Sequence, residues 1–364
     1  MASVSAKSYP DLSPQLTHLN LGLLHWYYES NVNWPWRQLW KRFRSPYHVW
    51  LSEIMLQQTV IKAVLPKYEA FLETFPTVRD LAAAEETDVK LACSGLGYYR
   101  RFGLMRKAAC VLVERSKGEI EWPSSYEEWL DLPGVGPYTA AAISSIVLGE
   151  ARAVVDGNVE RVLCRLLDIR EPVNSPHLKP VYLDRAAKLL IKKSPGDFNQ
   201  AVMELGQVLC RVTKPACPKC PLQEGCMSFR VGSQHLAPGA KIRKATKSVE
   251  LRVVVPKGKT NFGLMDRPLK AKFLKETLGF PTFLKKGRSY SGDGFDCAID
   301  WESGNKVGEF KHSITNHRIK AEVWEMPLLR VEREVGLERV SLKKGPKVLV
   351  SSFDKKTLEA AGFH

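Results

Sequence analysis

The sequence predicts an all-α domain followed by a smaller domain that combines strands with helices. In the first 230 residues apolar side chains recur at helical spacing, for example over 17–31, 46–61, 139–149 and 158–169. From about residue 249 the pattern changes to β-branched, alternating segments, namely VELRVVVP, HRIKAEVWEMPL and KVLVSSF. A chain of 364 residues is also longer than one ordinary hydrophobic core supports, so two domains are expected.

Composition divides the chain further. We expect a flexible lead-in over residues 1–14, a helical domain over 15–230, a basic linker over 231–248 and the strand-containing domain over 249–364. The opening MASVSAKSYPDLSP lacks the apolar core of a signal peptide. No stretch approaches the ~18 uncharged apolar residues of a membrane span. These features predict a cytoplasmic protein that has no membrane partner.

Positive charge is unevenly distributed along the chain, whose net formal charge is +15. Residues 1–230 carry 28 Lys and Arg against 24 Asp and Glu, whereas residues 231–364 carry 26 against 15. Such a surplus is typical of proteins that bind a polyanion, and nucleic acid is favoured over a membrane because no basic amphipathic anchor is present. The alternative is that these residues only keep the protein in solution.

Four of the eight cysteines fall within the segment CRVTKPACPKCPLQEGC. They have the spacing C-x6-C-x2-C-x5-C and are Cys210, Cys217, Cys220 and Cys226. Four thiols in so short a segment suit one structural metal centre. Zinc sites usually combine two CxxC-type knuckles and only one is present, so the spacing favours a [4Fe–4S] cluster over zinc. Disulfides are the remaining alternative, and a cytosolic location disfavours them.

The segment LPGVGPYTA (132–140) predicts a glycine turn between two helices. A dinucleotide-binding loop would need a preceding strand and a third glycine, and both are missing. A plain turn between helices remains possible. The basic surroundings favour a helix–hairpin–helix, in which Gly134, Gly136 and the start of the next helix hold a DNA phosphate.

Two carboxyl groups stand out by their sequence context. Glu53 lies in VWLSEIMLQQT among apolar residues, which predicts burial and a raised pKa, as a general acid near neutral pH requires. Asp156 follows an apolar run in AVVDGNVERV and by itself reads as an ordinary helix N-cap. One protonated and one ionised carboxyl together are the groups needed to break a glycosidic C–N bond through an oxocarbenium-like state.

The motifs LSEIMLQQT, GLGYYRR, LPGVGPYTA and VVDGNVERV, followed by the cysteine spacing, occur in the order seen in the endonuclease III superfamily of DNA glycosylases. The full set resembles the adenine DNA glycosylases of the MutY family over roughly residues 15–230. Residues 249–364 resemble that family's Nudix-like domain more weakly. The resemblance implies a multidomain fold, with an all-α helix-hairpin-helix glycosylase domain and an iron–sulfur loop before an α+β Nudix-like domain. It also implies a monomer at the nucleoid of a bacterial cytoplasm.

The same resemblance implies roles for individual residues. Glu53 would protonate a flipped adenine at N7 and Asp156 would stabilise the cationic sugar, with Tyr138 and Asn158 orienting them. The cysteines would hold a [4Fe–4S] cluster. Trp36 and Arg37 would line the base pocket, and Gln58 and Tyr98 would fill the stack left by flipping. The residues implied to contact the base or DNA are Trp36, Arg37, Gln57, Gln58, Tyr98, Gly134, Gly136, Thr315 and Asn316.

The residue type at position 138 predicts whether the DNA strand is cleaved after the base is removed. Relatives that also cleave the strand carry at this position a lysine, which forms a Schiff base with the sugar, and tyrosine cannot do so. The resemblance therefore implies a monofunctional glycosylase that removes adenine opposite 8-oxoguanine or guanine in duplex DNA and leaves an abasic site.

The C-terminal segment departs from the family pattern. No acidic helix of the kind that binds metal in working Nudix hydrolases is present, and VEREVGLE (331–338) is only a partial echo, so nucleotide hydrolysis is not expected. The family's Phe-Ser-His loop corresponds to Ile314, Thr315 and Asn316 in HSITNHRI. LKAKFLKETLGFP also differs from the usual pattern. Thr315 keeps a hydroxyl, but the aromatic and imidazole side chains of the family's loop are displaced or absent, so lesion recognition is expected to be retuned.

Three other functions remain open. A glycosylase and lyase for oxidised pyrimidines is opposed by Tyr138 and by the additional basic domain. A catalytically silent binder of damaged DNA is opposed by the presence of both Glu53 and Asp156. A transcription factor with a zinc loop is opposed because no recognition helix follows the cysteines.

Overall fold

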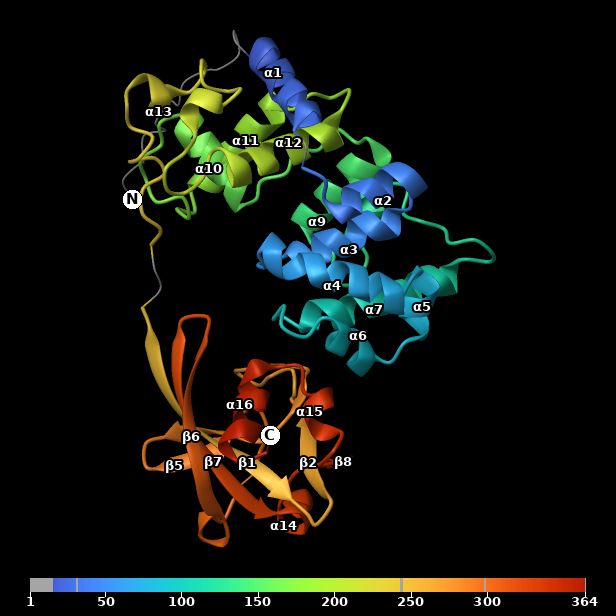
Figure 1. Ribbon diagram of the computed structural model, residues 1–364, viewed down its shortest axis with the longest axis vertical. Helices are drawn as coiled ribbons and strands as arrows, with labels where there is room; N and C mark the ends of the chain where they lie inside the picture. Colours follow the sequence, from blue (N-terminus) through green and yellow to red (C-terminus); the bar gives the residue numbers. More distant parts are fainter. Residues whose placement is uncertain (1–15, 31, 243–244, 298, 364) are drawn as a thin grey trace, which may run out of the picture. The chain divides into compact units, whose positions relative to one another are not determined.

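The computed structural model describes residues 16–30, 32–242, 245–297 and 299–363, and Figure 1 gives the order of its elements. The lead-in predicted over residues 1–14 lies outside the described residues. The chain forms two compact units, one of residues 1–53 and 121–243 and the other of residues 54–120 and 244–364. Each unit therefore combines two stretches that are distant in the sequence.

The first unit is built from helices, as the apolar spacing predicts. They are α1 (Leu16–Glu29), α2 (Pro35–Phe43), α3 (Pro46–Leu56, which continues into the second unit), α8 (Tyr126–Leu130), α9 (Pro137–Ile143), α10 (Gly157–Leu166), α11 (Leu178–Leu189), α12 (Pro195–Val208) and α13 (Met227–Arg230). A π-helical segment at Ser144–Leu148 follows α9, and a 3-10 turn lies at Cys217–Lys219.

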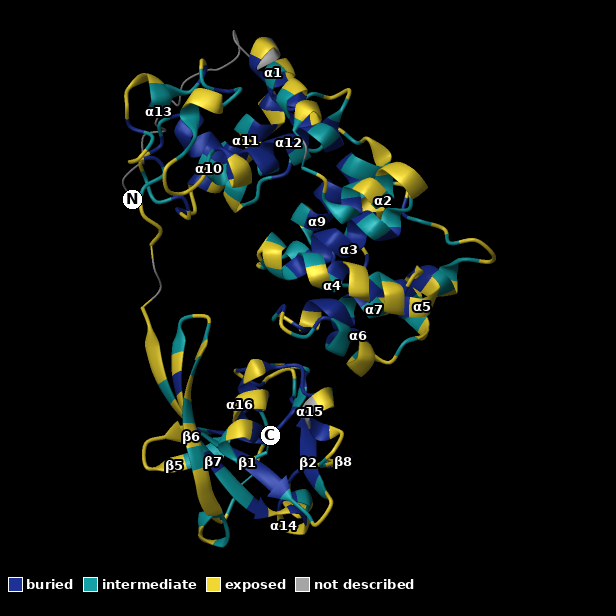
Figure 2. Ribbon diagram, in the orientation of Figure 1, coloured by how far each residue is buried: buried dark blue, intermediate teal, exposed yellow. Residues whose placement is uncertain are grey.

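Helices α10 and α12 pack together at the core of the first unit (Figure 2). Val159 and Leu163 on α10, and Leu205 on α12, are at most 2% exposed. Removing side chains of this size from water contributes ~1.5–3 kcal/mol each. The helices approach closely at Gly206, where an added Cβ would lie 2.7 Å from the Cβ of Asn158. This close approach fixes the position of the first turn of α10.

The helices of the second unit are α4 (Ile61–Thr74), α5 (Val78–Ala83), α6 (Glu86–Ala92) and α7 (Arg100–Arg115). A capping box starts α5, because Thr77 accepts a hydrogen bond from the Asp80 N–H and the Asp80 carboxylate accepts one from the Thr77 N–H. Helix α7 carries the fully buried side chains of Phe102 and Leu112. No helix in the described part of the chain is long and apolar enough to cross a bilayer.

The C-terminal part of the second unit is a mixed sheet with short helices. Its strands are β1 (Lys247–Lys257), β2 (Asn261–Asp266), β3 (Leu278–Gly279), β4 (Thr282–Lys286), β5 (Ser289–Gly292), β6 (Asn305–Ile314), β7 (His317–Pro327) and β8 (Glu338–Ser341). Strand β1 pairs antiparallel with β2 and β4 and parallel with β7, and β6 and β7 form a hairpin. The helices are α14 (Leu328–Glu334), α15 (Gly345–Val348) and α16 (Ser352–Ala360).

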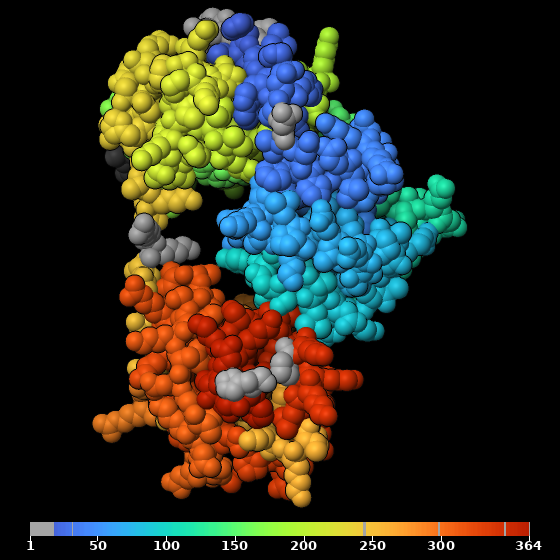
Figure 3. All heavy atoms as spheres, viewed as in Figure 1, coloured from blue at the N-terminus to red at the C-terminus, as the bar shows by residue number. Residues whose placement is uncertain are grey.

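The core of this sheet region lies between the sheet and α16. Phe353 of α16 meets Phe310 of β6 edge-on, with ring centroids 5.1 Å apart. Buried Leu251, Phe262 and Leu358 belong to the same apolar cluster. In the space-filling view the segments coloured orange to red form one continuous packed body (Figure 3).

One predicted strand is wrong. VELRVVVP and HRIKAEVWEMPL form β1 and β7 as predicted, but KVLVSSF covers the end of α15, an irregular segment and the start of α16. The Ser351 hydroxyl accepts a hydrogen bond from the Asp354 N–H and caps α16, so a helix begins where the sequence suggested a strand. Leu349 and Val350 are buried on consecutive positions, which explains why this short apolar run was ambiguous.

Candidate active site and cysteine-lined pocket

Asp156 occupies the N-cap position of α10. Oδ1 accepts hydrogen bonds from the backbone N–H groups of Asn158 and Val159 at 2.9 and 2.8 Å, and Oδ2 accepts one from the Asn158 side-chain amide at 2.7 Å. Burial raises the pKa of this carboxyl, whereas the three hydrogen bonds favour its ionised form. Asp156 is therefore a helix cap, and it is also a half-buried carboxylate with a fixed orientation.

Asn199 on α12 holds the segment that leads to Asp156. Its side-chain amide donates to the Arg152 carbonyl at 2.8 Å and to the Ser145 hydroxyl at 3.0 Å, and its oxygen accepts from the Val154 N–H at 3.2 Å. One buried side chain thus connects the π-helical segment, the approach to α10 and α12. These contacts determine where the cap of α10 can lie.

Glu53 lies on α3 and is 9% exposed, and the nearby Leu51 and Ile54 are at most 1% exposed. The pKa of the Glu53 carboxyl is raised to about 7: burial contributes most, the negative charge of Asp156 also raises it, and the positive charge of Arg37 lowers it. Glu53 is therefore close enough to Asp156 and to Arg37 for their charges to change its pKa. A carboxyl with this pKa can hold and release a proton near neutral pH.

Tyr138 lies in the first turn of α9 beside the two carboxyl groups. Its hydroxyl donates a hydrogen bond to the Met203 sulfur at 3.3 Å. Burial raises the pKa of Tyr138, and the charges of Glu53 and Asp156 raise it further. The phenol therefore stays protonated next to the carboxyl pair.

Arg37 on α2 forms a buried ion pair with Glu204 on α12. The Arg37 side chain is 13% exposed and that of Glu204 is fully buried. Arg37 also donates to Gln200 Oε1 at 3.0 Å, its guanidinium lies 4.9 Å from the Tyr27 ring centroid, and the Ser30 hydroxyl donates to Glu204 at 2.7 Å. These contacts fix the position of the Arg37 guanidinium, whose positive charge lowers the pKa of Glu53.

Glu204, Gln200 and Met203 are site residues that were not predicted from the sequence. Glu204 lies in the apolar run AVMELGQVL, so the criterion that selected Glu53 would also have selected it. Trp36, which the sequence did single out, is 8% exposed and stacks on Trp34 with ring centroids 5.7 Å apart.

The glycine turn predicted at 132–140 connects α8 and α9. Gly134 has φ +80°, a conformation that other residues rarely adopt. Gly136 is the N-cap of α9, Pro137 is its first residue, and no side chain caps this helix start. The turn therefore leaves α9 with an N-terminus to which no side chain is bonded.

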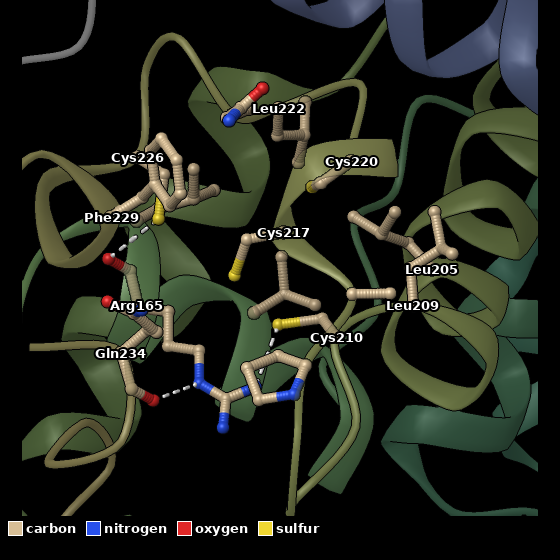
Figure 4. A pocket seen from close by; sticks show the side chains of 15 residues that line it. Arg165, Leu205, Leu209, Cys210, Cys217, Cys220, Leu222, Cys226, Phe229 and Gln234 are labelled. Carbon is tan, nitrogen blue, oxygen red and sulfur yellow. Dashed lines mark hydrogen bonds between the residues drawn. The ribbon is translucent and has the colours of Figure 1, made fainter. Parts of the chain in front are cut away.

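All four predicted cysteines line one pocket in the first unit (Figure 4). Among the described residues, no three His, Cys, Asp or Glu side chains converge closely enough to hold a single metal ion. The buried Arg165 guanidinium donates to the Cys210 sulfur at 3.2 Å and to the Arg211 carbonyl at 2.7 Å. The sulfurs therefore surround a hollow instead of meeting at a point.

Arg161 connects the cysteine segment with the first turn of α10. Its Nη2 donates to the Asn158 side-chain oxygen at 2.9 Å, and its Nε donates to the Cys210 carbonyl at 2.7 Å. Burial lowers the pKa of Arg161. The position of Asn158 is consequently linked to the backbone that carries Cys210.

The chain is similar to known base excision DNA repair proteins. Residues 51–177 match the family model of the HhH-GPD superfamily base excision DNA repair proteins. An adenine DNA glycosylase of Buchnera aphidicola subsp. Acyrthosiphon pisum (strain APS) is 31% identical over 265 residues, which are 72% of this chain and 74% of that protein. The chain belongs to the adenine DNA glycosylase family.

The chain spans less than half the length of several curated relatives that it matches. The adenine DNA glycosylase of Rattus norvegicus is 40% identical over 232 residues, which are 62% of this chain but only 45% of the rat protein. A solved structure of a thermostable thymine-DNA glycosylase superposes with a TM-score of 0.51 at 23% identity, covering 60% of this chain and 98% of that one. This structural likeness establishes the fold of the helical part.

In this adenine DNA glycosylase family member, Gln57, Gln58 and Tyr98 lie in the second unit, on two short loops. Gln58 follows α3 and Tyr98 precedes α7. Gln58 has φ +55° and Tyr98 has φ +47°, and Tyr98 is 51% exposed. Thus both residues that the sequence resemblance predicts to enter the DNA stack have the left-handed backbone conformation, which is uncommon outside glycine.

Thr315 and Asn316 form the two-residue turn of the β6–β7 hairpin in this family member. Thr315 has φ +52°, and its hydroxyl donates to the Ile314 carbonyl at 2.7 Å. The Asn316 side-chain amide donates to the Ala245 carbonyl at 2.9 Å. Both polar side chains are therefore held by local backbone groups at an exposed tip.

Proposed function

We propose that this protein is a monofunctional DNA glycosylase that removes adenine opposite 8-oxoguanine or guanine and leaves an abasic site. The observation that carries the proposal is the juxtaposition of Glu53, with a pKa of about 7, and the hydrogen-bonded carboxylate of Asp156. Membership of the adenine DNA glycosylase family supports adenine as the leaving base. The proposed substrate is duplex DNA, which would put a monomeric enzyme at the nucleoid in the cytoplasm.

The chemistry divides between the two carboxyl groups. Glu53 would hold its proton at neutral pH because it is buried, and would donate it to N7 of an adenine flipped out of the duplex. The base would then leave with the electrons of the C–N bond. The negative charge of Asp156 would stabilise the positive charge that develops on the sugar, and water would complete the hydrolysis.

Tyr138 supports base removal without strand cleavage. Cleavage by this superfamily's lyase route needs an amine that forms a Schiff base with the sugar. At this position the protein has a phenol whose pKa is raised, and whose hydroxyl bonds to Met203. Tyr138 would instead orient Glu53 and the sugar, and Asn158 would keep Asp156 in place.

Arg37 and Trp36 would border the adenine pocket, and the contacts of Arg37 support this. Its guanidinium is held by Glu204 and Gln200. A cation fixed in this way would contribute to the field around Glu53 without moving when the base enters.

The four cysteines suit a [4Fe–4S] cluster as a structural cofactor. Their thiols line a common hollow, whereas a single zinc ion would need the sulfurs to converge on one point. The cluster, when bound, would crosslink the segment between α12 and α13. Arg165 would donate a hydrogen bond to the sulfur of Cys210.

Several separate segments of the chain would contact DNA. Gly134, Gly136 and the uncapped start of α9 suit a backbone phosphate. Gln57, Gln58 and Tyr98 would contact the stack at the flipped base, and Thr315 and Asn316 would contact the opposing base from a Nudix-like domain. The surplus of Lys and Arg in residues 231–364 supports a DNA-facing role for that domain.

One assay tests the proposal. The protein is incubated with duplexes that contain adenine opposite 8-oxoguanine or guanine, and the products are compared with and without alkali. Strand breaks that appear only after alkali support a monofunctional glycosylase, and breaks without alkali contradict the assignment of Tyr138. Absence of an abasic product contradicts the function itself. Glu53→Gln is the control, because it should still bind DNA but not excise the base. Absorbance at about 400 nm distinguishes an iron–sulfur cluster from zinc.

A further inference from the structure

The loops of residues 57–59 and 96–98 are joined by one buried side chain. Arg101, in the first turn of α7, donates through Nη1 to the Gln57 carbonyl. Its Nη2 donates to the Thr59 hydroxyl at 2.8 Å and to the Leu96 carbonyl at 3.4 Å. The Thr59 hydroxyl in turn lies 3.2 Å from the Leu96 carbonyl and 3.2 Å from the Gln57 carbonyl, and can donate its proton to either loop. Arg101 and Thr59 therefore form a clamp between the two loops.

Both clamped loops contain backbone in the left-handed region. Gln58 lies between the two clamped residues of the first loop, and Tyr98 follows Leu96 in the second. Their φ values are +55° and +47°, and Gly97 between Leu96 and Tyr98 has φ +68°. Non-glycine residues remain in this conformation only when surrounding contacts determine it. The hydrogen bonds of Arg101 to the adjoining residues are such contacts.

Burying the Arg101 guanidinium carries a desolvation cost that stability alone does not explain. It is 7% exposed, burial lowers its pKa to about 10, and no carboxylate among the described residues forms an ion pair with it. Its Nε has no hydrogen-bond partner within the described residues. An apolar side chain would fill the space without this desolvation cost, but would leave the two loops unconnected.

We propose that Arg101 is a positioning residue, which with Thr59 holds Gln58 and Tyr98 in the conformations that enter the DNA stack. The inference rests on the proposed function and adds to it the groups that preorganise base extrusion. Gln58 and Tyr98 are exposed and would touch DNA, whereas Arg101 is buried and acts through the loops. A loop already held in its bound conformation loses less conformational freedom on binding, so extrusion of the base becomes more favourable.

Thr59→Val is the discriminating variant, because valine keeps the shape of threonine and removes the hydroxyl that links Arg101 to Leu96. Single-turnover excision is measured on adenine opposite 8-oxoguanine and on adenine opposite an abasic-site analogue. In the second duplex the adenine is unpaired, so no base pair has to be broken to extrude it. Extrusion is also followed directly by the fluorescence of 2-aminopurine placed at the target position. We expect the rate on the paired substrate to fall about tenfold and the rate on the unpaired substrate to change little.

Matched variants separate positioning from folding. Thr59→Ser keeps a hydroxyl at this position and should excise adenine as the parent protein does. Arg101→Lys keeps the positive charge but loses the planar guanidinium that bonds to both loops, so it should behave like Thr59→Val. Thr74→Val, which removes an exposed hydroxyl bonded to the Ala70 carbonyl on α4, should match the parent protein. The midpoint of the pH–rate profile should be the same in all of these variants, because it reports the titration of Glu53, which none of them changes.

Three results would overturn the inference. Equal losses on paired and unpaired substrates would mean that the clamp supports the fold or the chemistry and not extrusion. Unchanged excision and unchanged 2-aminopurine fluorescence in Thr59→Val and Arg101→Lys would mean that the loops need no clamp. If the parent protein removes adenine from neither duplex, the proposed function is wrong and this inference fails with it. This outcome can be told apart from failure of the inference alone, because it is observed with the parent protein before any variant is made.

Discussion

Replacing Glu53 by glutamine should abolish excision and also make the protein more stable at high pH. In the folded protein, burial raises the pKa of Glu53 from 4.5 to about 7, with the neighbouring charge of Asp156 adding to the effect. The folded state therefore binds this proton more tightly than the unfolded chain does. The stability that follows is complete below about pH 4.5 and is lost as the pH rises through about 7.

The size of the effect follows from the pKa shift. One pKa unit corresponds to about 1.4 kcal/mol, so ionising the buried carboxyl costs the folded state ~3 kcal/mol. Glutamine has nearly the same shape and never ionises. The free energy of unfolding of Glu53→Gln minus that of the parent protein should thus increase by roughly 2–3 kcal/mol between about pH 5 and about pH 8.5.

Urea unfolding at the two pH values measures this difference. Tryptophan fluorescence is a suitable probe, because Trp50 lies on the same helix as Glu53 and is fully buried. Comparing the two proteins at each pH cancels the other titrating groups. The reasoning is refuted if the difference is independent of pH, or if Glu53→Gln becomes the less stable protein as the pH rises.

Three further predictions follow from the site. Arg37→Met leaves the fully buried Glu204 carboxylate without its cation and should cost about 3–5 kcal/mol in urea unfolding, whereas the double variant with Glu204→Leu should recover most of the loss; equal losses would argue against a coupled pair. Tyr138→Lys should give strand breaks without alkali and an adduct that borohydride traps, and absence of the adduct would contradict the position assigned to this side chain. Gly206→Ala places a Cβ 2.7 Å from a side chain of α10 and should destabilise the first unit by ~1–3 kcal/mol, while Gly118→Ala, with no atom within 4 Å, should be neutral by thermal unfolding.

Local patterns in the sequence identified most elements of the fold. The helical spacing of the first 230 residues, the change to alternating strands near residue 249 and the N-cap at Asp156 are all encoded by neighbours a few residues apart. Where the local pattern was ambiguous, as in KVLVSSF, the cap at Ser351 and the packing of α16 decided for helix. The order of the motifs also predicted the adenine DNA glycosylase family.

The sequence by itself determined which residues are available for chemistry, and only the tertiary structure decided how they act on one another. Glu53 and Asp156 are about a hundred residues apart, so the effect of Asp156 on the pKa of Glu53, which is about 7, depends on how the folded chain brings α3 near the start of α10. The pairing of Arg37 with Glu204, and the clamp of Arg101 on two loops, likewise join distant segments. Burial and electrostatic coupling are properties of the packed chain, because they depend on which side chains exclude water from which charges.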